Sequence, residues 1–129
     1  MTLYLSLDQV LQIHDAQIER FGGSSGLRDL GALESAVGRP AMTFGGEDLY
    51  PDVPSKTAAL MHSLVMNHAF MDGNKRVGVT AAELFLRLNG YRLDAGNPEL
   101  EELTLTVAKG ELDAETLAIW FRQRISRED

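Results

Sequence analysis

Two apolar stretches that flank a short polar loop constrain the fold of this chain most strongly. Residues 57–66 and 77–88 are dominated by alanine, leucine, valine and methionine, and the loop between them, residues 68–76, reads HAFMDGNKR. In the second stretch the apolar side chains recur at the spacing of one helix face: Val77, Ala81, Leu84, Phe85 and Leu88. Both stretches therefore predict buried helices, and Pro54 or Ser55 is the expected start of the first.

The rest of the chain predicts four further helices. A capping box, Ser6 with Gln9, opens the first, and Gly22-Gly23 ends it. The expected starts of the others are Asp29, Asn97 or Pro98, and Asp113, with ends near Val37, Gly110 and Arg127, and residues 91–94 read as extended. We therefore expect an all-α fold, a compact bundle of about six helices in a single domain over residues 1–129.

Composition narrows the classes of function. The chain has no cysteines and therefore no disulfides, which fits a reducing cytoplasm, and its first residues lack the basic and apolar regions of a signal peptide. No apolar run approaches the length of a membrane span, so we expect a cytoplasmic protein without a membrane partner. The net charge of −7 argues against direct binding to nucleic acid, which depends on cationic contacts to phosphates.

The polar loop has the composition of an anion site. Gly73 permits a tight turn, and a helix that begins near Asn74 would direct its first N–H groups back at the loop. Lys75 and Arg76 would add positive charge beside this nest. The pattern predicts that Gly73, Asn74, Lys75 and Arg76 bind the phosphates of a nucleotide such as ATP.

Two more residues of the loop predict a reaction at those phosphates. Asp72 could hold a Mg²⁺ ion that bridges phosphate oxygens, and His68 could take a proton from a hydroxyl nucleophile. The alternative is a solvated turn between two helices. For His14, on the apolar stripe of the first helix, the favoured interpretation is a hydrogen-bonded core histidine.

The loop resembles the signature of the death-on-curing (Doc) toxins, H-x-F-x-[DN]-[AG]-N-K-R, a branch of the Fic fold. The wider Fic family carries H-P-F-x-x-G-N-G-R-x-x-R. This chain has Ala69 for the proline, Lys75 for the second glycine and Val79 for the last arginine, and all three departures point towards Doc. Further similarity extends from Ile13-His14-Asp15 to the end of the second apolar stretch at Asn89-Gly90.

The resemblance implies a toxin that transfers a phosphoryl group from ATP, with Mg²⁺, to a hydroxyl of elongation factor Tu. In this interpretation His68 is the general base, Asp72 the metal ligand and residues 73–76 the phosphate site. The alternatives are AMP transfer to a protein hydroxyl, as in the wider family, and a binding module without catalysis.

The resemblance also implies two features around the site. Residues 41–54 would form a flap over the active site that aligns the target segment. No inhibitory [ST]-x-x-x-E-[GN] helix is visible, since the nearest stretch, Thr43–Asp48, ends in Asp and contains Gly45-Gly46. Inhibition would then come from a cognate, Phd-like antitoxin. Its disordered tail would fold into a groove near Leu11, Ile18 and Phe21, for which the alternative is a place in the core, and any DNA contact would be made by the antitoxin.

Overall fold

The structure is a computed structural model that describes residues 1–128. Its helices are α1 (Leu7–Phe21), α2 (Leu30–Gly38), α3 (Val53–Met66), α4 (Asn74–Leu88), α5 (Asn97–Ala108) and α6 (Ala114–Arg124), with a 3-10 turn at Arg39–Ala41. Two antiparallel two-stranded sheets complete it, β1 (Thr43–Phe44) with β2 (Glu47–Asp48) and β3 (Tyr91–Leu93) with β4 (Ile125–Arg127). The fold is all-α, as the sequence predicts. Among the described residues no helix has the length and apolarity needed to cross a bilayer.

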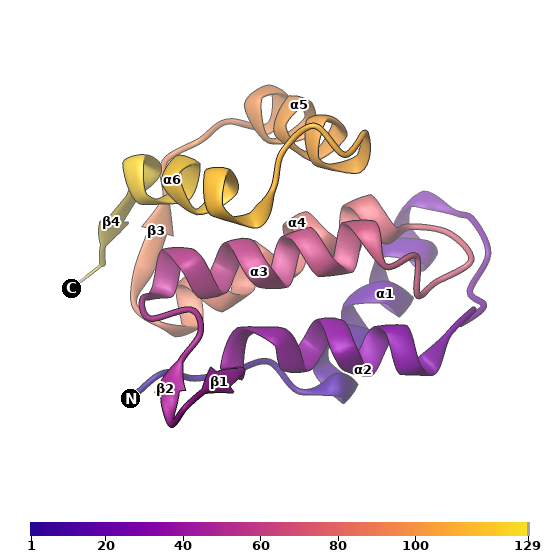
Figure 1. Ribbon diagram of the computed structural model, residues 1–129. Coiled ribbons are helices and arrows are strands. Elements are labelled where there is room, and N and C mark those ends of the chain that lie inside the picture. The colour runs from indigo at the N-terminus through magenta and orange to yellow at the C-terminus, as the bar shows by residue number, and fades with distance from the viewer. Residues whose placement is uncertain (129) are drawn as a thin grey trace.

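Helix α3 lies at the centre of the bundle. It runs between α5 and α6 on one side and α2 on the other, while α4 packs along it in the opposite direction (Figure 1). Ten of its fourteen residues are buried, which explains why its sequence is apolar on nearly every face. One core cluster joins α3 and α4 to α1 and α2, and a second joins them to α5 and α6. The loop 67–73 leaves the carboxyl end of this central helix.

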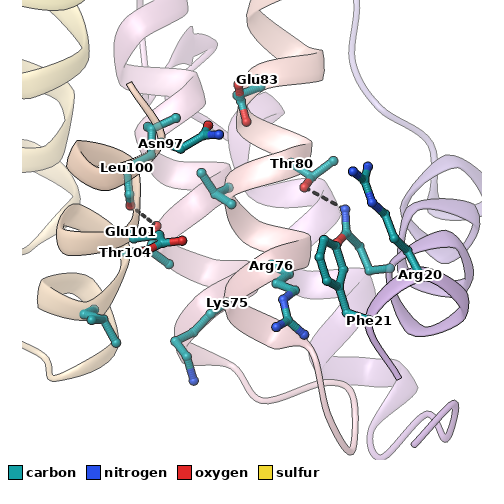
Figure 2. Close-up of a pocket in the computed structure, with 13 residues that line it drawn as sticks. Arg20, Phe21, Lys75, Arg76, Thr80, Glu83, Asn97, Leu100, Glu101 and Thr104 are labelled. Atoms are coloured by element: carbon teal, nitrogen blue, oxygen red, sulfur yellow. Dashed lines mark hydrogen bonds between the residues drawn. The ribbon is translucent and has the colours of Figure 1, made fainter. Parts of the chain in front are cut away.

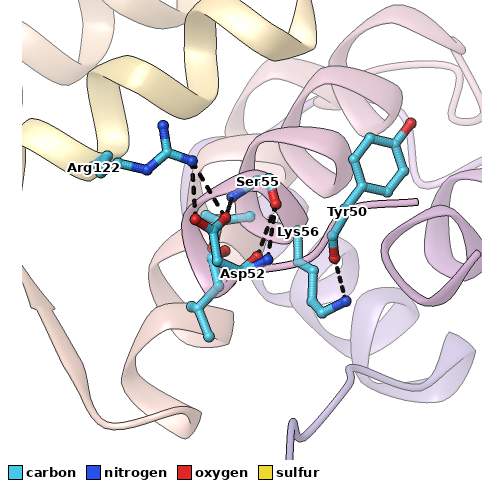
Figure 3. Close-up of polar contacts among 7 residues, drawn as sticks. Tyr50, Asp52, Ser55, Lys56 and Arg122 are labelled. Carbon is cyan, nitrogen blue, oxygen red and sulfur yellow. Dashed lines mark hydrogen bonds and ion pairs between the residues drawn. The ribbon is translucent and has the colours of Figure 1, made fainter. Parts of the chain in front are cut away.

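Side-chain caps fix where the helices begin. The predicted capping box of Ser6 and Gln9 is present at α1, and Asp29 and Asp113 cap α2 and α6. The sequence interpretation placed the start of α3 one or two residues late. Asp52 is its N-cap, and Asp52 and Ser55 form a second capping box. The Arg122 side chain also binds the Asp52 carboxylate at 3.0 Å, which ties α6 to the start of α3 (Figure 3).

The predicted flap contains the β1–β2 hairpin, and a buried lysine anchors it. Lys56 is 2% exposed, and its ammonium donates to the Tyr50 carbonyl (Figure 3). It also donates to the Pro40 carbonyl and pairs with Asp48 at 3.1 Å. Lys56 precedes His68 by twelve residues, or about 18 Å along a helix. The hairpin and the polar loop lie at opposite ends of α3 (Figure 1). The expectation of a flap over the loop is therefore corrected, since these contacts hold the hairpin beside the start of α3.

The end of the chain departs from the predicted helix. Helix α6 stops at Arg124, and residues 125–127 form β4, in register with β3 through the pairs Leu93↔Ile125 and Tyr91↔Arg127. The N–H of Asp94 donates to the Arg124 carbonyl at 2.7 Å. Pairing with a strand about thirty residues earlier in the chain has no local sequence signal, which explains why the helical pattern was extended too far.

Candidate active site

His68 stands at the mouth of the polar loop in a constrained backbone conformation. Helix α3 ends at Met66, and His68 has a φ of 50°, the only positive φ of a non-glycine residue within 1–128. Its side chain is exposed. A left-handed conformation at a residue with a large side chain persists only where neighbouring contacts hold the backbone.

Those contacts come from the glycine-rich loop between α1 and α2. The N–H groups of Arg28 and Asp29 donate to the Ala69 carbonyl at 2.8 and 3.0 Å, and the Met71 N–H donates to the Gly26 carbonyl at 2.9 Å. Leu27 and Phe70 form an isolated antiparallel bridge. Residues 26–29 thus pair with residues 69–71 like two short strands, which fixes the backbone next to His68.

The side chain of Asn74 forms hydrogen bonds with the backbone of the loop. Its amide nitrogen donates to the Phe70 carbonyl at 3.0 Å, and its amide oxygen accepts from the Phe70 N–H at 3.1 Å. The sequence interpretation assigned Asn74 to the anion nest. In the structure the carboxamide binds the loop backbone, so Asn74 has only its backbone N–H to offer to an anion.

His14 supports the turn that follows. It is 1% exposed, its ring stacks on Phe70 with centroids 3.8 Å apart, and its Nε2 lies 2.9 Å from the Asp72 carbonyl oxygen. The Gly73 N–H donates to the Asp72 Oδ1 at 2.9 Å. The interpretation of His14 as a hydrogen-bonded core histidine is confirmed.

The first turn of α4 has the predicted anion-binding geometry. Gly73 is the N-cap, with a φ of 84°, and no side chain within 1–128 caps this end. The first hydrogen bond of the helix runs from the Val77 N–H to the Gly73 carbonyl, so the N–H groups of residues 74–76 precede it. Free N–H groups at a helix start attract anions. Lys75 and Arg76 are exposed on this turn.

The side chains of Lys75 and Arg76 open onto a groove of about 630 Å³ between α1, α4 and α5 (Figure 2). Phe21, 51% exposed, lies at this end, and the Arg76 guanidinium sits 4.4 Å above its ring. Gln17 donates to Thr80 across the α1–α4 seam at 3.0 Å (Figure 2). Towards the other end, burial raises the pKa of Glu83, against the opposing effect of Arg87.

Of the three residues expected to line an antitoxin groove, only Phe21 lines this one. Leu11 packs against the core cluster of α1 to α4. The Ile18 side chain lies against the glycine backbones: a Cβ built on Gly23 or Gly73 would be 3.3 or 3.6 Å from its Cδ1. Leu11 is thus part of the core packing, and Ile18 packs against the backbone of the loop.

The Asp72 carboxylate is suited to a Mg²⁺ ion that arrives with a nucleotide. One oxygen accepts from Gly73, and the side chain is exposed. No group of three acidic or imidazole side chains that could hold a metal exists among residues 1–128. Mg²⁺ commonly takes one carboxylate, with substrate phosphates and water as its other ligands. The residues present therefore fit an ion held jointly by Asp72 and phosphate.

Sequence reasoning missed three features of this site: the pairing of residues 26–29 with the loop, the internal role of Asn74, and the stacking of Arg76 on Phe21. A signal existed for the first, because Gly22-Gly23 and Gly26 indicate backbone that can approach another chain segment closely.

Fold and site together define a helical protein in which an exposed histidine and an anion-binding helix start share one rigid loop. The profile of the Fic/DOC family matches residues 4–86, and the chain belongs to this family. It is 42% identical over 120 residues to a protein named Toxin Doc from Mycolicibacterium smegmatis, which covers 92% of this chain and 90% of that protein. It is 33% identical to the Protein kinase doc of Escherichia phage P1, over 93% of this chain and 94% of the relative.

Proposed function

We propose that this protein is the toxin of a toxin–antitoxin system, and that it transfers the γ-phosphoryl group of ATP to a hydroxyl of a protein such as elongation factor Tu. The observation that carries the proposal is the loop 68–76. It combines an exposed histidine, a carboxylate and a cationic helix start on one constrained backbone. The relative named Protein kinase doc supports phosphoryl transfer over the other chemistries of the family.

In the proposed reaction His68 accepts the proton of the target hydroxyl while that oxygen attacks the γ-phosphorus. The bond from the γ-phosphorus to the β–γ bridging oxygen breaks, and ADP leaves. Lys75 and the N–H groups at the start of α4 bind the phosphate oxygens, and Arg76 joins them by turning from Phe21. Asp72 would hold Mg²⁺, which supplies charge neutralisation at those oxygens when bound.

The test is to incubate the protein with its target and ATP labelled at either the α- or the γ-phosphorus. Phosphoryl transfer puts only the γ-label on the target, with a mass increase of about 80 Da for an added phosphate group. Label from the α-position would instead establish AMP transfer. A target that stays unmodified, together with a His68→Ala variant as toxic as wild type, would favour a binding module.

Neutralisation by a second protein follows from the same proposal. We infer that a Phd-like antitoxin tail folds into the groove between α1, α4 and α5, which begins at Lys75 and Arg76. Its floor is apolar at Phe21, Val79, Leu100 and Leu105, and one end is cationic. A helix with an apolar face and an acidic residue at one end fits that pattern. A tail in this position would lie against the first turn of α4 and restrict nucleotide binding.

Expression of the chain alone in a bacterial host tests this partner. We expect growth arrest that co-expression of the antitoxin relieves. Harmless accumulation of wild-type protein that is active in vitro, with no copurifying partner, would contradict the proposal.

A further inference from the structure

A single peptide unit connects the buried His14 to the carboxylate of Asp72. The Asp72 carbonyl oxygen lies 2.9 Å from the His14 Nε2. The Gly73 N–H, which belongs to the same peptide unit, donates to the Asp72 Oδ1 at 2.9 Å. Rotation of this peptide plane would move both partners together. The His14 imidazole therefore influences the orientation of the Asp72 carboxylate without contacting it.

The other contacts of the His14 ring hold it rigidly. The ring stacks on Phe70 with an interplanar angle of 8°, and Phe70 is itself clamped by Asn74. The imidazole also lies against Gly73, where an added Cβ would be 3.6 Å from its Cδ2. A buried ring with a fixed plane presents its N–H in one direction, so the Asp72 carbonyl has one preferred position.

The end of α1 leaves room for the second carboxylate oxygen. A Cβ added to Gly23 would lie 2.3 Å from the Asp72 Oδ2, much closer than a carbon and an oxygen that are not bonded can approach. Gly23 has a φ of 112°, so the close approach depends on glycine for conformation as well as space. Helix α1 and its terminal turn thus contact Asp72 at its carbonyl and at its carboxylate.

We propose that His14 is a positioning residue: it donates from Nε2 to the Asp72 carbonyl and thereby sets the orientation of the Asp72 carboxylate towards a nucleotide-bound cation. The binding of a cation rests on the function proposed above, whereas the hydrogen bonds that link His14 to Asp72 are present in the protein without ligand. Loss of a group that orients a metal-binding carboxylate typically costs about 10- to 100-fold in metal affinity or activity.

Two substitutions at His14 distinguish the contribution of its N–H donor from that of its aromatic ring. His14→Gln keeps an amide donor near the Nε2 position, and His14→Phe keeps an aromatic ring against Phe70 but cannot donate. We expect His14→Phe to bind Mn²⁺ with the β,γ-imido analogue of ATP about 10- to 100-fold more weakly, as measured by electron paramagnetic resonance. Its kcat should fall at saturating nucleotide while the KM for the protein target is unchanged, and His14→Gln should recover most of both losses.

His62→Gln is the matched control, because it removes a half-buried histidine remote from the loop. It should leave Mn²⁺ binding unchanged. Thermal unfolding of all three variants separates positioning from stability. Equal losses in His14→Phe and His14→Gln, or wild-type binding in both, would overturn the proposal.

A measurement on the wild-type protein decides the question even if His14→Phe does not fold. The ¹⁵N spectrum of the imidazoles in the wild-type protein must show the His14 proton on Nε2. A neutral His14 with its proton on Nδ1 would exclude the bond and the proposal. Absence of Mn²⁺ binding in a wild-type protein with the expected tautomer would instead refute the proposed nucleotide chemistry and the cation-directed role that rests on it.

Discussion

The residues of the signature loop divide into those that hold it and those that face solvent. Asn74 binds the Phe70 backbone, and Ala69 and Met71 pair with the preceding glycine-rich loop. His68 and Lys75 remain exposed. A site that binds a charged ligand benefits from this division, because the exposed groups are placed before the ligand arrives.

At His68, we expect substitution to remove activity while the fold persists. Asn is the sharper replacement, since it tolerates the left-handed backbone that His68 adopts and Ala does so less well. Loss of a general base lowers the rate by about 10² to 10⁴. The measurement is single-turnover phosphorylation of the target, with thermal unfolding as the check on folding.

His14→Gln and His62→Gln are the comparison for that experiment, and each should lose activity only as far as it loses stability. A well-folded His14→Gln protein that binds Mn²⁺ normally and is as inactive as His68→Asn would show that the proton acceptor has been assigned to the wrong histidine.

The lowered pKa of His62 predicts that the stability of the protein depends on pH. Burial lowers its pKa, the nearby Arg39 lowers it further, and Asp113 acts in the opposite direction. Arg39 also lies 3.2 Å from the His62 Nδ1, a contact that requires the neutral ring as acceptor. The unfolded chain therefore binds more protons at this site, so stability is complete above about pH 6.5 and falls as the pH drops below it.

Urea unfolding at about pH 8 and pH 5.5 measures this dependence. We expect the wild-type protein to lose more free energy of unfolding between the two pH values than His62→Gln, which has no titrating ring. Equal losses in both proteins would mean that His62 does not titrate differently on folding.

Among the elements, the β1–β2 hairpin depends on one side chain of α3. Lys56 supplies the donors for the carbonyls of Pro40 and Tyr50 and pairs with Asp48. Lys56→Met should fill the same space but leave those carbonyls without this donor. We expect faster hydrogen exchange at the Leu49 amide, which binds the Met42 carbonyl at 2.9 Å, with a much smaller change in α3.

Arg122→Met is the control for the hairpin experiment. It removes an exposed ion pair with Asp52 at the same end of α3, an interaction worth about 0–1 kcal/mol. Exchange at Leu49 should be unaffected by it. If Lys56→Met also left that amide protected, the anchoring role of the lysine would be refuted.

The packing of α3 against α4 depends on Gly78. A Cβ there would lie 2.6 Å from the Val65 Cγ2, and Val65 is buried and cannot turn away. Overpacking of this kind costs about 1–3 kcal/mol, against a gain of at most about 1 kcal/mol in helix propensity. Gly78→Ala should therefore be destabilised in urea unfolding.

Gly38→Ala provides the comparison, because a Cβ at Gly38 meets no atom within 4 Å and α2 ends there. It should be neutral or slightly more stable than wild type. A stabilised Gly78→Ala protein would mean that the two central helices separate easily.

At the scale of the whole molecule, three helices from distant parts of the chain assemble the groove. Leu105, 49% exposed on α5, lines the groove and has no part in the proposed reaction. If the antitoxin tail binds here, Leu105→Glu should weaken its binding at least tenfold, since burial of a leucine is worth about 1.5–3 kcal/mol. Phosphorylation of the target should be unchanged. Isothermal titration with the tail peptide measures the affinity.

Ile119→Glu is the matched control for the groove. Ile119 is 47% exposed on α6 and does not line the groove, so the same substitution there should leave tail binding intact. Equal affinities for both variants would move the antitoxin site away from this groove.

The sequence by itself determined the helices and the location of the candidate site. Caps such as Ser6 with Gln9, and the apolar periodicity of residues 77–88, act between neighbours three to four positions apart, so they can be read along the chain. Gly73 likewise marks the left-handed start of α4. These signals are local, and the structure agrees with them to within one or two residues at the caps of α1, α2, α4 and α6.

Only the tertiary structure decided how the loop is held and what lies beside it. The bond from His14 to Asp72 spans 58 positions, and β4 pairs with a strand more than thirty positions earlier. The hairpin of residues 43–48 lies by the start of α3 because Lys56 anchors it, and Phe21 meets Arg76 because α1 crosses α4. Contacts of this kind arise when separate helices pack, and a single sequence carries no periodic or capping signal for which distant residues will meet.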